Sequence, residues 1–254
     1  MTKINSPSEW ERLNLQGYAD SANSTIPQSA KAGRNGLASD GSIEEMIAED
    51  IFKKISQKEH QNVLDLGCGC GPLANLVIER CTYLNHSLTM MDQRAVISEL
   101  KQQIQGSGKV NLIDGIFPYD SNLLGNQKFD SIILYGVMQY ATDPVKFVRS
   151  LIEFLRPGGH LLVGDIPNSD KKKRFLMTEH GVQIDKKYRS TFESNKDVMP
   201  SVDLTPPIEF NDSFVSTLLG QVRTMRCESY LLPQAAGLPF CFTRDDLLII
   251  KNLD

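Results

Sequence analysis

The chain has 254 residues, of which 41% are hydrophobic and 23% charged, and its 31 acidic against 27 basic side chains give a formal net charge of −4. This length suits one large domain or a domain with a small appendage, and the near-average composition excludes wholesale disorder and fibrous repeats. The acidic balance argues against a dedicated nucleic-acid-binding protein, and no apolar run approaches the roughly 18–20 residues of a membrane span.

Residues 1–41 are rich in Ser, Asn, Gly and Ala, which is typical of an irregular arm. Short apolar clusters in this arm predict one short helix near Pro7–Asn14. From Ser42 to about Lys58 apolar residues recur at helical spacing, and acidic residues lie in the N-terminal half, where the helix dipole favours anions. This second segment is predicted to be an amphipathic helix.

Short apolar runs and helical patterns then alternate along the chain. Strands are predicted at 63–66, 87–91, 109–113, 129–135 and 160–164, and helices begin at Pro72 and cover 95–104 and 144–155. This alternation indicates βαβ units and a parallel, doubly wound sheet.

A polar insertion, residues 167–207, interrupts the alternation and contains the basic run Lys171–Arg174. A helix at 211–220 follows, and two further strands, 226–232 and 247–251, are joined by a short loop that suits an antiparallel pair. The predicted fold class is therefore α/β, with a doubly wound, mostly parallel seven-stranded sheet whose last strand is antiparallel. We expect the arm (1–41) to be a lid on a domain spanning 42–254, and the insertion (167–207) to be a substrate-binding lid.

Five cysteines are an odd number, and their spacing is not that of a disulfide framework. Cys68 and Cys70 have no Cys or His ladder to complete a zinc site, so we assign no metal and expect reduced thiols. The first residues are too polar for a secretory signal, so we expect a cytoplasmic protein.

The most informative segment is a glycine-rich turn, Gly67–Gly71, between a predicted strand and a helix that begins at Pro72. Glycines at such a turn let the backbone approach a ligand closely. A dinucleotide site needs the spacing G-x-G-x-x-G, and here Pro72 takes the third glycine's place. Asp65, two residues before the turn, would repel a pyrophosphate and suits an amino-bearing ligand. The turn therefore favours a ligand without phosphates.

Five motifs in order resemble those of the class I S-adenosylmethionine-dependent methyltransferases. They are the acid and glycine turn Asp65–Gly71, the strand-ending Met91-Asp92, the segment Asp114–Ile116, the strand Phe129–Ile133 followed by Tyr135–Val137, and the turn Leu155–Leu161. The resemblance implies a Rossmann-like fold and S-adenosylmethionine as cofactor, with S-adenosylhomocysteine as product.

The same resemblance implies a set of cofactor-binding residues: Asp65, Gly67, Gly69, Gly71, Asp92, Gln93, Asp114, Gly115, Ile116, Tyr135 and Gly136. Asp92 would hold both ribose hydroxyls, and the segment at Asp114 would meet the adenine. Structural alternatives stay open, because Asp65 can brace the turn, and Asp92 and Asp114 can each cap a neighbouring element.

Catalytic candidates follow the fourth and fifth strands, because ligands of open parallel sheets bind beyond the carboxyl ends of the strands. They are Tyr135, Gln139 and Tyr140, then Asp165 and Asn168. Asp165 is the candidate acid nearest the reacting group, although a structural hydrogen-bonding role fits it equally well. Gln139 cannot take a proton at neutral pH and stands where several relatives have a His. His180 of the insertion is a further candidate base, and Tyr18 of the arm can cover the cofactor.

The acceptor is expected to be a small molecule rather than nucleic acid, because the signatures of adenine and cytosine methyltransferases are missing. Lys171–Arg174 can attract an anionic group such as an acidic sugar, or can be a solvated helix face. The segment GDIPNSDKKKRF resembles bacterial methyltransferases of surface-polysaccharide biosynthesis, which favours a sugar-type acceptor and O- or N-methylation. The alternative is a catalytically lapsed S-adenosylmethionine-binding partner or regulatory protein. The sequence does not determine the oligomeric state.

Overall fold

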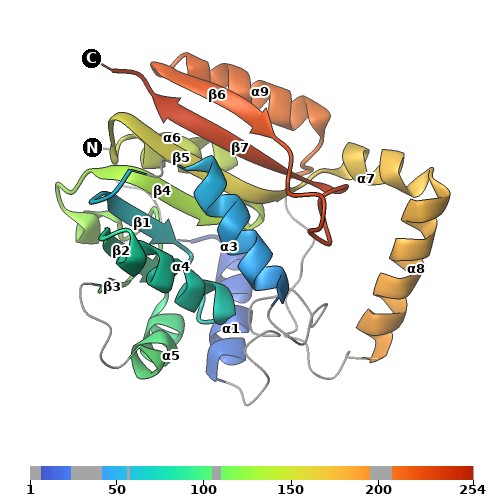
Figure 1. The fold of residues 1–254 in the computed structure, drawn as a ribbon, viewed down its shortest axis with the longest axis horizontal. Helices are drawn as coiled ribbons and strands as arrows, with labels where there is room; N and C mark the ends of the chain where they lie inside the picture. The colour runs from blue at the N-terminus through green and yellow to red at the C-terminus, as the bar shows by residue number, and fades with distance from the viewer. Residues whose placement is uncertain (1–6, 24–41, 56–57, 105–109, 195–207, 254) are drawn as a thin grey trace.

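A computed structural model describes residues 7–23, 42–55, 58–104, 110–194 and 208–253 (Figure 1). Its α-helices are α1 (Glu9–Asn23), α3 (Ser42–Lys54), α4 (Pro72–Tyr83), α5 (Arg94–Gln103), α6 (Pro144–Ile152), α7 (Ser169–Leu176), α8 (Glu179–Ser194) and α9 (Asp212–Arg223). Two 3₁₀ turns are η1 (Ser121–Leu124) and η2 (Met138–Tyr140).

The strands of the described chain form one seven-stranded sheet in the order β3-β2-β1-β4-β5-β7-β6. Their bounds are β1 (Asn62–Leu66), β2 (Ser87–Asp92), β3 (Val110–Asp114), β4 (Phe129–Tyr135), β5 (Leu155–Pro167), β6 (Cys227–Leu232) and β7 (Arg244–Lys251). The first five strands pair in parallel, and β7 is antiparallel to both β5 and β6. The predicted fold class is confirmed, and the order reverses between β1 and β4, where the connection crosses the sheet.

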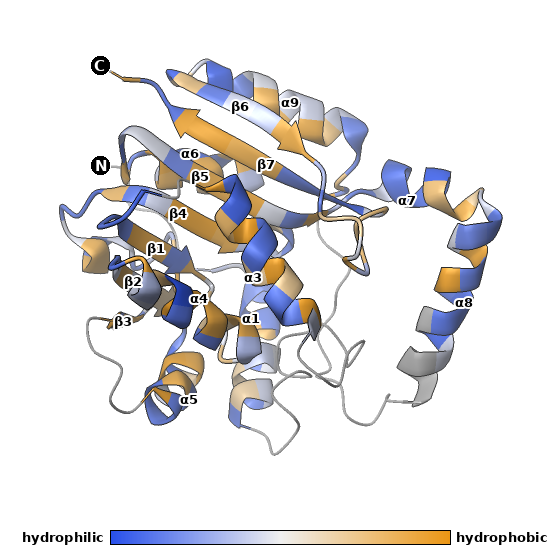
Figure 2. Ribbon diagram, viewed as in Figure 1, coloured by the Kyte–Doolittle hydropathy of each residue, from blue (hydrophilic) through white to orange (hydrophobic). Residues whose placement is uncertain are grey.

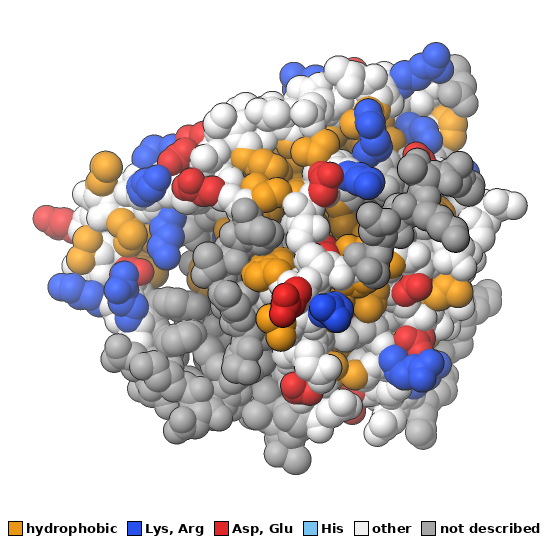
Figure 3. Space-filling model, turned by 180° about the vertical axis from the view of Figure 1, so that it is seen from behind, with side chains coloured by type: hydrophobic (Ala, Val, Ile, Leu, Met, Phe, Trp, Pro, Cys, Tyr) orange, Lys and Arg blue, Asp and Glu red, His pale blue; other side chains and the backbone are white. Residues whose placement is uncertain are grey.

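Helices cover both faces of the sheet, because successive strand residues point to opposite sides. Leu64, Ile132 and Leu161 belong to one apolar cluster, which α6 and α9 complete. Val63, Ile133 and Leu162 belong to the other, completed by α3, α4 and α5. The hydropathy colours show apolar central strands and two-sided helices (Figure 2). On the face opposite to that view, described side chains of both charges are interspersed (Figure 3).

The arm contains a longer helix than the sequence predicted. The short helix expected near Pro7–Asn14 is α1, which continues to Asn23. It begins with a reciprocal capping box, in which the Ser8 N–H donates to Glu11 (2.7 Å) and the Glu11 N–H donates to the Ser8 hydroxyl (3.2 Å). Helix α1 packs against α5, and this tertiary contact stabilises a segment whose composition resembles a loop. Residues 24–41 of the arm lie outside the described chain.

Strand β5 also differs from the prediction, because it begins at Leu155 and not at His160. Leu155 pairs with Phe129 and His160 pairs with Ser131, so β5 uses extra residues at this point and bulges. Helix α6 accordingly ends at Ile152 instead of reaching Leu155.

The described part of the insertion is helical. It forms α7 and α8, which project from the sheet on one side (Figure 1). Residues 195–207 of the insertion lie outside the described chain. No helix among the described residues is both long enough and apolar enough to cross a membrane.

Candidate functional site

The glycine turn and Asp92 meet at the carboxyl ends of β1 and β2. Asp92 Oδ2 accepts a hydrogen bond from the Gly69 N–H (2.9 Å), and Oδ1 accepts one from the Gln93 N–H (2.7 Å). Gly67 and Gly69 both have left-handed backbone angles, with φ of +67° and +65°. A Cβ on Gly67 would lie 2.5 Å from Val137 Cγ2, whereas a Cβ on Gly69 would meet nothing within 4 Å. Gly67 thus allows close packing and Gly69 leaves open space beside the acid.

Burial raises the pKa of Asp92 to about 6, although the N–H groups of Gly69 and Gln93 oppose this by stabilising the carboxylate. The two oxygens of a carboxylate carry about four lone pairs, and these N–H groups use two of them. Two acceptor positions on Asp92 therefore remain for the hydroxyls of a ligand.

Asp114 lies beside Asp92, since the two pair in the β2–β3 register. Its carboxylate accepts a hydrogen bond from Arg94 Nε (2.8 Å), and both side chains are exposed. The Gly115 N–H donates to the Asp92 carbonyl (2.9 Å), and the Ile116 N–H donates to Asp120 Oδ2 (2.8 Å). The segment predicted to meet adenine is thus at the correct edge, and the adenine role itself stays a prediction.

Helix α1 brings Tyr18 to the same edge of the sheet. The hydroxyls of Tyr18 and Tyr140 share a short hydrogen bond, and their rings meet edge-on with centroids 5.2 Å apart. Burial, followed by the neighbouring Tyr140, raises the pKa of Tyr18 well above its usual value. The charges of Arg244 and Asp92 also act on this phenol, Arg244 lowering its pKa and Asp92 raising it. Tyr18 therefore stays a neutral phenol within electrostatic range of both charged groups.

Glu11 connects α1 to the loops that follow β3 and β4. Its carboxylate accepts hydrogen bonds from the Tyr119 hydroxyl (2.8 Å) and the Thr142 hydroxyl (3.0 Å). Burial opposes the ionisation of Glu11, but the hydrogen bonds from Ser8, Tyr119 and Thr142 together lower its pKa. The arm is held over the strand ends by an ionised side chain.

Tyr135 is the last residue of β4, and Asp165 lies near the carboxyl end of β5. Gln234 hydrogen-bonds to both side chains. Gln234 Nε2 donates to the Tyr135 hydroxyl (3.3 Å), to Asp165 Oδ1 (3.4 Å) and to Asp246 Oδ1 (3.0 Å). Asp165 has φ of +60°, a conformation that costs roughly 1–2 kcal/mol outside glycine, at the irregular register between Val163 and Ile166. The fold therefore holds Asp165 in a strained bulge at the carboxyl end of β5.

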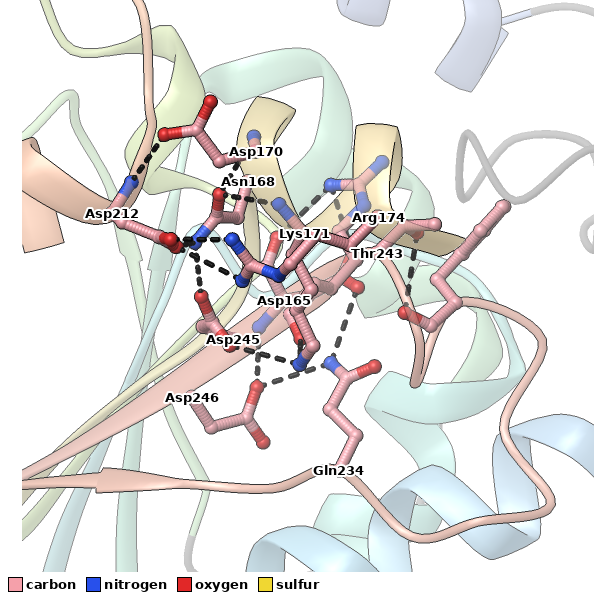
Figure 4. Close-up of polar contacts among 12 residues, drawn as sticks. Asp165, Asn168, Asp170, Lys171, Arg174, Asp212, Gln234, Thr243, Asp245 and Asp246 are labelled. Atoms are coloured by element: carbon pink, nitrogen blue, oxygen red, sulfur yellow. Dashed lines mark hydrogen bonds and ion pairs between the residues drawn. The ribbon is translucent and has the colours of Figure 1, made fainter. Parts of the chain in front are cut away.

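Asp246 supports this bulge from below (Figure 4). It is fully buried, accepts the Asp165 N–H (2.8 Å), and pairs with Lys54 Nζ (2.7 Å), which also contacts Asp50. Burial raises the pKa of Asp246, while Lys54 and the hydrogen bonds oppose this. The network joins α3 to the sheet edge where ligands of such folds bind.

Asn168 caps α7 and joins it to β7, as Figure 4 shows. The side-chain Oδ1 of Asn168 accepts hydrogen bonds from the N–H groups of Asp170 and Lys171 (3.0 Å each), and its side-chain Nδ2 donates to Asp245 Oδ2 (2.7 Å). Asn168 is therefore structural in its contacts, although it follows β5 as predicted.

The basic run Lys171–Arg174 is largely neutralised by acids. Lys171 pairs with Asp245 (2.9 Å), Lys173 with Asp170 (3.3 Å), and Arg174 with Asp212. These ion pairs leave only Lys172 of the run without an ionic partner among the described residues, which weakens the reason that the sequence offered for an anionic acceptor here. His180 is exposed on α8, edge-on to Phe175 and Phe242 at 6.0 Å from each ring. The described contacts do not bring His180 to Asp92 or Asp165.

Gln139 and Gly136 lie in the turn after β4. Gln139 Nε2 donates to the Gly136 carbonyl (2.9 Å), which fixes the turn. The residues that sequence reasoning missed are Glu11, Gln234 and Arg244. The S-x-x-E capping pattern at Ser8 was a signal for Glu11, whereas nothing local marks the other two, which reach the site only through the sheet.

These residues fit S-adenosylmethionine. A sugar with two adjacent hydroxyls needs two acceptor positions, which Asp92 offers, and the open space beside Gly69 allows the ligand to approach the backbone. Asp65 is buried before the turn, and its negative charge suits the amino group of the methionine part.

A comparison with known families gives a match to the family described as "Methyltransferase domain" over residues 42–196. The ubiquinone biosynthesis O-methyltransferase of Proteus mirabilis is 26% identical over 149 residues, which cover 56% of this chain and 56% of that protein. The malonyl-[acyl-carrier protein] O-methyltransferase of Haemophilus ducreyi is 26% identical over 114 residues, 44% of this chain and 43% of that protein. The chain thus spans about half the length of these relatives.

Solved structures show the same fold. A plantazolicin methyltransferase in complex with S-adenosylhomocysteine has a TM-score of 0.62 at 14% identity, covering 96% of this chain and 98% of that chain. The N-methyltransferase NodS of Bradyrhizobium japonicum, also with S-adenosylhomocysteine, has a TM-score of 0.56 at 15% identity, covering 95% and 100%. The resemblance inferred from the five motifs is confirmed: this chain belongs to the methyltransferase-domain family, the class I S-adenosylmethionine-dependent methyltransferases.

Proposed function

We propose that the protein transfers the methyl group of S-adenosylmethionine to an oxygen or nitrogen atom of a small-molecule acceptor. The observation that carries the proposal is the meeting of Asp92 with Gly69 at one end of the sheet, beside the Tyr18–Tyr140 pair. Relatives with the names of ubiquinone and malonyl-[acyl-carrier protein] O-methyltransferases support oxygen as the acceptor atom, and NodS supports nitrogen.

Methyl transfer needs an in-line approach of the acceptor to the sulfonium carbon, so positioning and the exclusion of water supply much of the rate. The arm supports both, because Glu11 fixes α1 across the loops after β3 and β4. An oxygen acceptor must also release a proton. Asp165 is the carboxylate we propose for this step, since Tyr18 is held neutral and His180 is exposed away from the site.

A sugar or a related biosynthetic intermediate is the acceptor class that we propose, on the resemblance of the segment GDIPNSDKKKRF, which begins in β5 and continues into α7. Tyr135 would then position the acceptor or cofactor through its hydroxyl, which Gln234 already holds.

The experiment is methyl transfer from radiolabelled S-adenosylmethionine to the small molecules of a cell extract. Label in a low-molecular-weight product supports the proposal, and the Asp92→Ala variant serves as the control that lacks the ribose acceptor. If the wild type binds S-adenosylhomocysteine but labels no component, the lapsed, regulatory alternative is favoured instead.

We also propose that the arm (1–41) and the insertion (167–207) form lids over the cofactor. Limited proteolysis should cut within residues 1–40 or 167–205, and S-adenosylhomocysteine should slow the cutting because closure protects the backbone. Cleavage at the same rate with and without S-adenosylhomocysteine would contradict the lid.

A further inference from the structure

Arg244 is the first residue of β7, and its side chain lies at the ligand-binding edge of the sheet. The reason is topological: β7 runs antiparallel to β5, so the start of β7 meets the carboxyl end of β5, where Pro167 pairs with Arg244. Neither the glycine turn nor the motifs of the fold include this residue.

Three contacts orient the guanidinium. Nη1 donates to the Asp165 carbonyl (3.0 Å) and lies 3.6 Å from Asp165 Oδ2, and the ring of Phe240 stacks 5.1 Å from the guanidinium carbon. The side chain of Arg244 is 24% exposed. These contacts use the Nη1 nitrogen and one face of the guanidinium plane. No described residue accepts a hydrogen bond from Nε or Nη2. Nε and Nη2 form the lateral edge of a guanidinium, whose two parallel N–H donors match a carboxylate or a phosphate.

The tyrosine pair adds a further donor near this edge. Two hydroxyls joined by one hydrogen bond have one proton left to donate, and the described residues provide no other hydrogen-bond partner for either hydroxyl. The Arg244 charge lowers the pKa of the Tyr18 phenol, so the two groups lie within electrostatic range of each other. Arg244 therefore offers unused donors beside Asp165, the carboxylate that we propose takes the proton of the acceptor.

We propose that Arg244 is the specificity-determining residue of the acceptor site and binds an anionic group of the acceptor through Nε and Nη2. This inference rests on the proposed methyl transfer and adds that the acceptor, a sugar or related intermediate, carries a carboxylate or a phosphate ester. The basic run Lys171–Arg174 suits this role less well, because ion pairs engage Lys171, Lys173 and Arg174 and leave only Lys172 without an ionic partner among the described residues.

The test divides a small-molecule cell extract by anion exchange at pH 7.5 into a retained, anionic fraction and a flow-through. Each fraction is incubated with radiolabelled S-adenosylmethionine and the wild type, Arg244→Gln, Arg244→Lys or Arg156→Gln. Arg156 is the matched control, since its guanidinium pairs with Asp130 at the opposite end of β4. Phosphatase treatment of the anionic fraction separates phosphate esters from carboxylates.

We expect the wild type to label the anionic fraction. When this fraction is added in limiting amount, Arg244→Gln should lower the labelling roughly 10- to 100-fold, because charge-assisted hydrogen bonds to the acceptor are lost. The loss should be in the apparent KM for the fraction more than in kcat, with unchanged S-adenosylhomocysteine affinity by calorimetry. Arg244→Lys should recover part of the loss, because Lys keeps the charge and can reach the Asp165 carbonyl but lacks the fork. Arg156→Gln should behave as the wild type.

Label only in the flow-through would overturn the role of Arg244 while leaving methyl transfer intact. Equal labelling of the anionic fraction by the wild type and by both Arg244 variants would overturn it too. A weaker affinity of Arg244→Gln and Arg244→Lys for S-adenosylhomocysteine would place the guanidinium on the cofactor instead. No label in either fraction would contradict the proposed function itself, and the inference with it.

Discussion

Replacing Asp92 with Asn tests how the cofactor is held. The carboxylate has two acceptor positions beyond its bonds to the Gly69 and Gln93 N–H groups. Asn has one neutral oxygen in place of the two carboxylate oxygens, and its NH₂ group would face a backbone N–H donor. The variant therefore loses charge-assisted hydrogen bonds to the ribose hydroxyls that together contribute about 2–4 kcal/mol to the binding free energy. The dissociation constant for S-adenosylhomocysteine should rise roughly 30- to 700-fold.

The pH dependence of the same binding follows from the raised pKa of Asp92, about 6. Only the carboxylate accepts both ribose hydroxyls, so the wild-type affinity should be constant above about pH 6 and fall by up to tenfold per pH unit below it. Asn does not titrate, so the affinity of the variant should vary little between pH 5 and 8. Calorimetry at several pH values measures both effects.

The folded protein itself should tolerate the substitution. Because the folded pKa of Asp92 exceeds its usual value of 3.8, ionisation costs stability on the order of 2–3 kcal/mol above pH 6, and this cost is absent below pH 3.8. Asn avoids the cost and loses one backbone hydrogen bond of about 1 kcal/mol. The cofactor-free variant should therefore melt at or above the wild-type temperature at pH 7.5. Wild-type affinity in Asp92→Asn, or a flat wild-type pH profile, would refute the ribose role.

Three further substitutions test the scaffold, each by urea unfolding. Gly67→Ala should destabilise by about 1–3 kcal/mol, because the new Cβ lies 2.5 Å from Val137 Cγ2 and φ is +67°; adding Val137→Ala should recover part of this. Glu11→Gln should lower the free energy of unfolding by about 1–2 kcal/mol at pH 7 and leave it unchanged near pH 2. The reason is that the lowered pKa of Glu11 stabilises the folded protein above pH 4.5, and this stabilisation is lost as the carboxylate becomes protonated. Hydrogen exchange of the α1 amides should become faster in the variant. Lys54→Met should cost about 3–5 kcal/mol by leaving Asp246 charged and buried.

Each of these has a contrary result. A Gly67→Ala protein as stable as the wild type would mean that the turn relaxes, so the conformation is not required. Unchanged exchange in α1 of Glu11→Gln would show that packing on α5 alone holds the arm. If Lys54→Met loses the same stability at pH 4 as at pH 7.5, the loss does not come from the charge of Asp246, whose protonation should relieve it.

The sequence alone predicted the fold class and the elements that bring the glycine turn and Asp92 together. Hydrophobic periodicity places the strands, because a buried strand and an amphipathic helix have different repeats, and β4 occurs at the predicted Phe129–Tyr135. The spacing around Gly67–Gly71 and the acid at Asp92 could also be read locally, since a turn and the end of a strand are short-range features. The meeting of Gly69 with Asp92 follows from parallel neighbours that end at one edge.

Only the tertiary structure decided the surroundings of Asp165, where we propose that the acceptor binds. Gln234 and Arg244 come from the end of the chain and reach Asp165 because β7 is inserted between β5 and β6. The extra turns of α1 depend on contacts to α5 and on Glu11, which composition does not record. Lys171–Arg174 has the charge of an anion site in the sequence, yet folding brings acids from β7 and α9 against it. Whether a charged side chain forms an ion pair or keeps free donors depends on which strands become neighbours in the sheet. Local sequence patterns do not contain this long-range pairing.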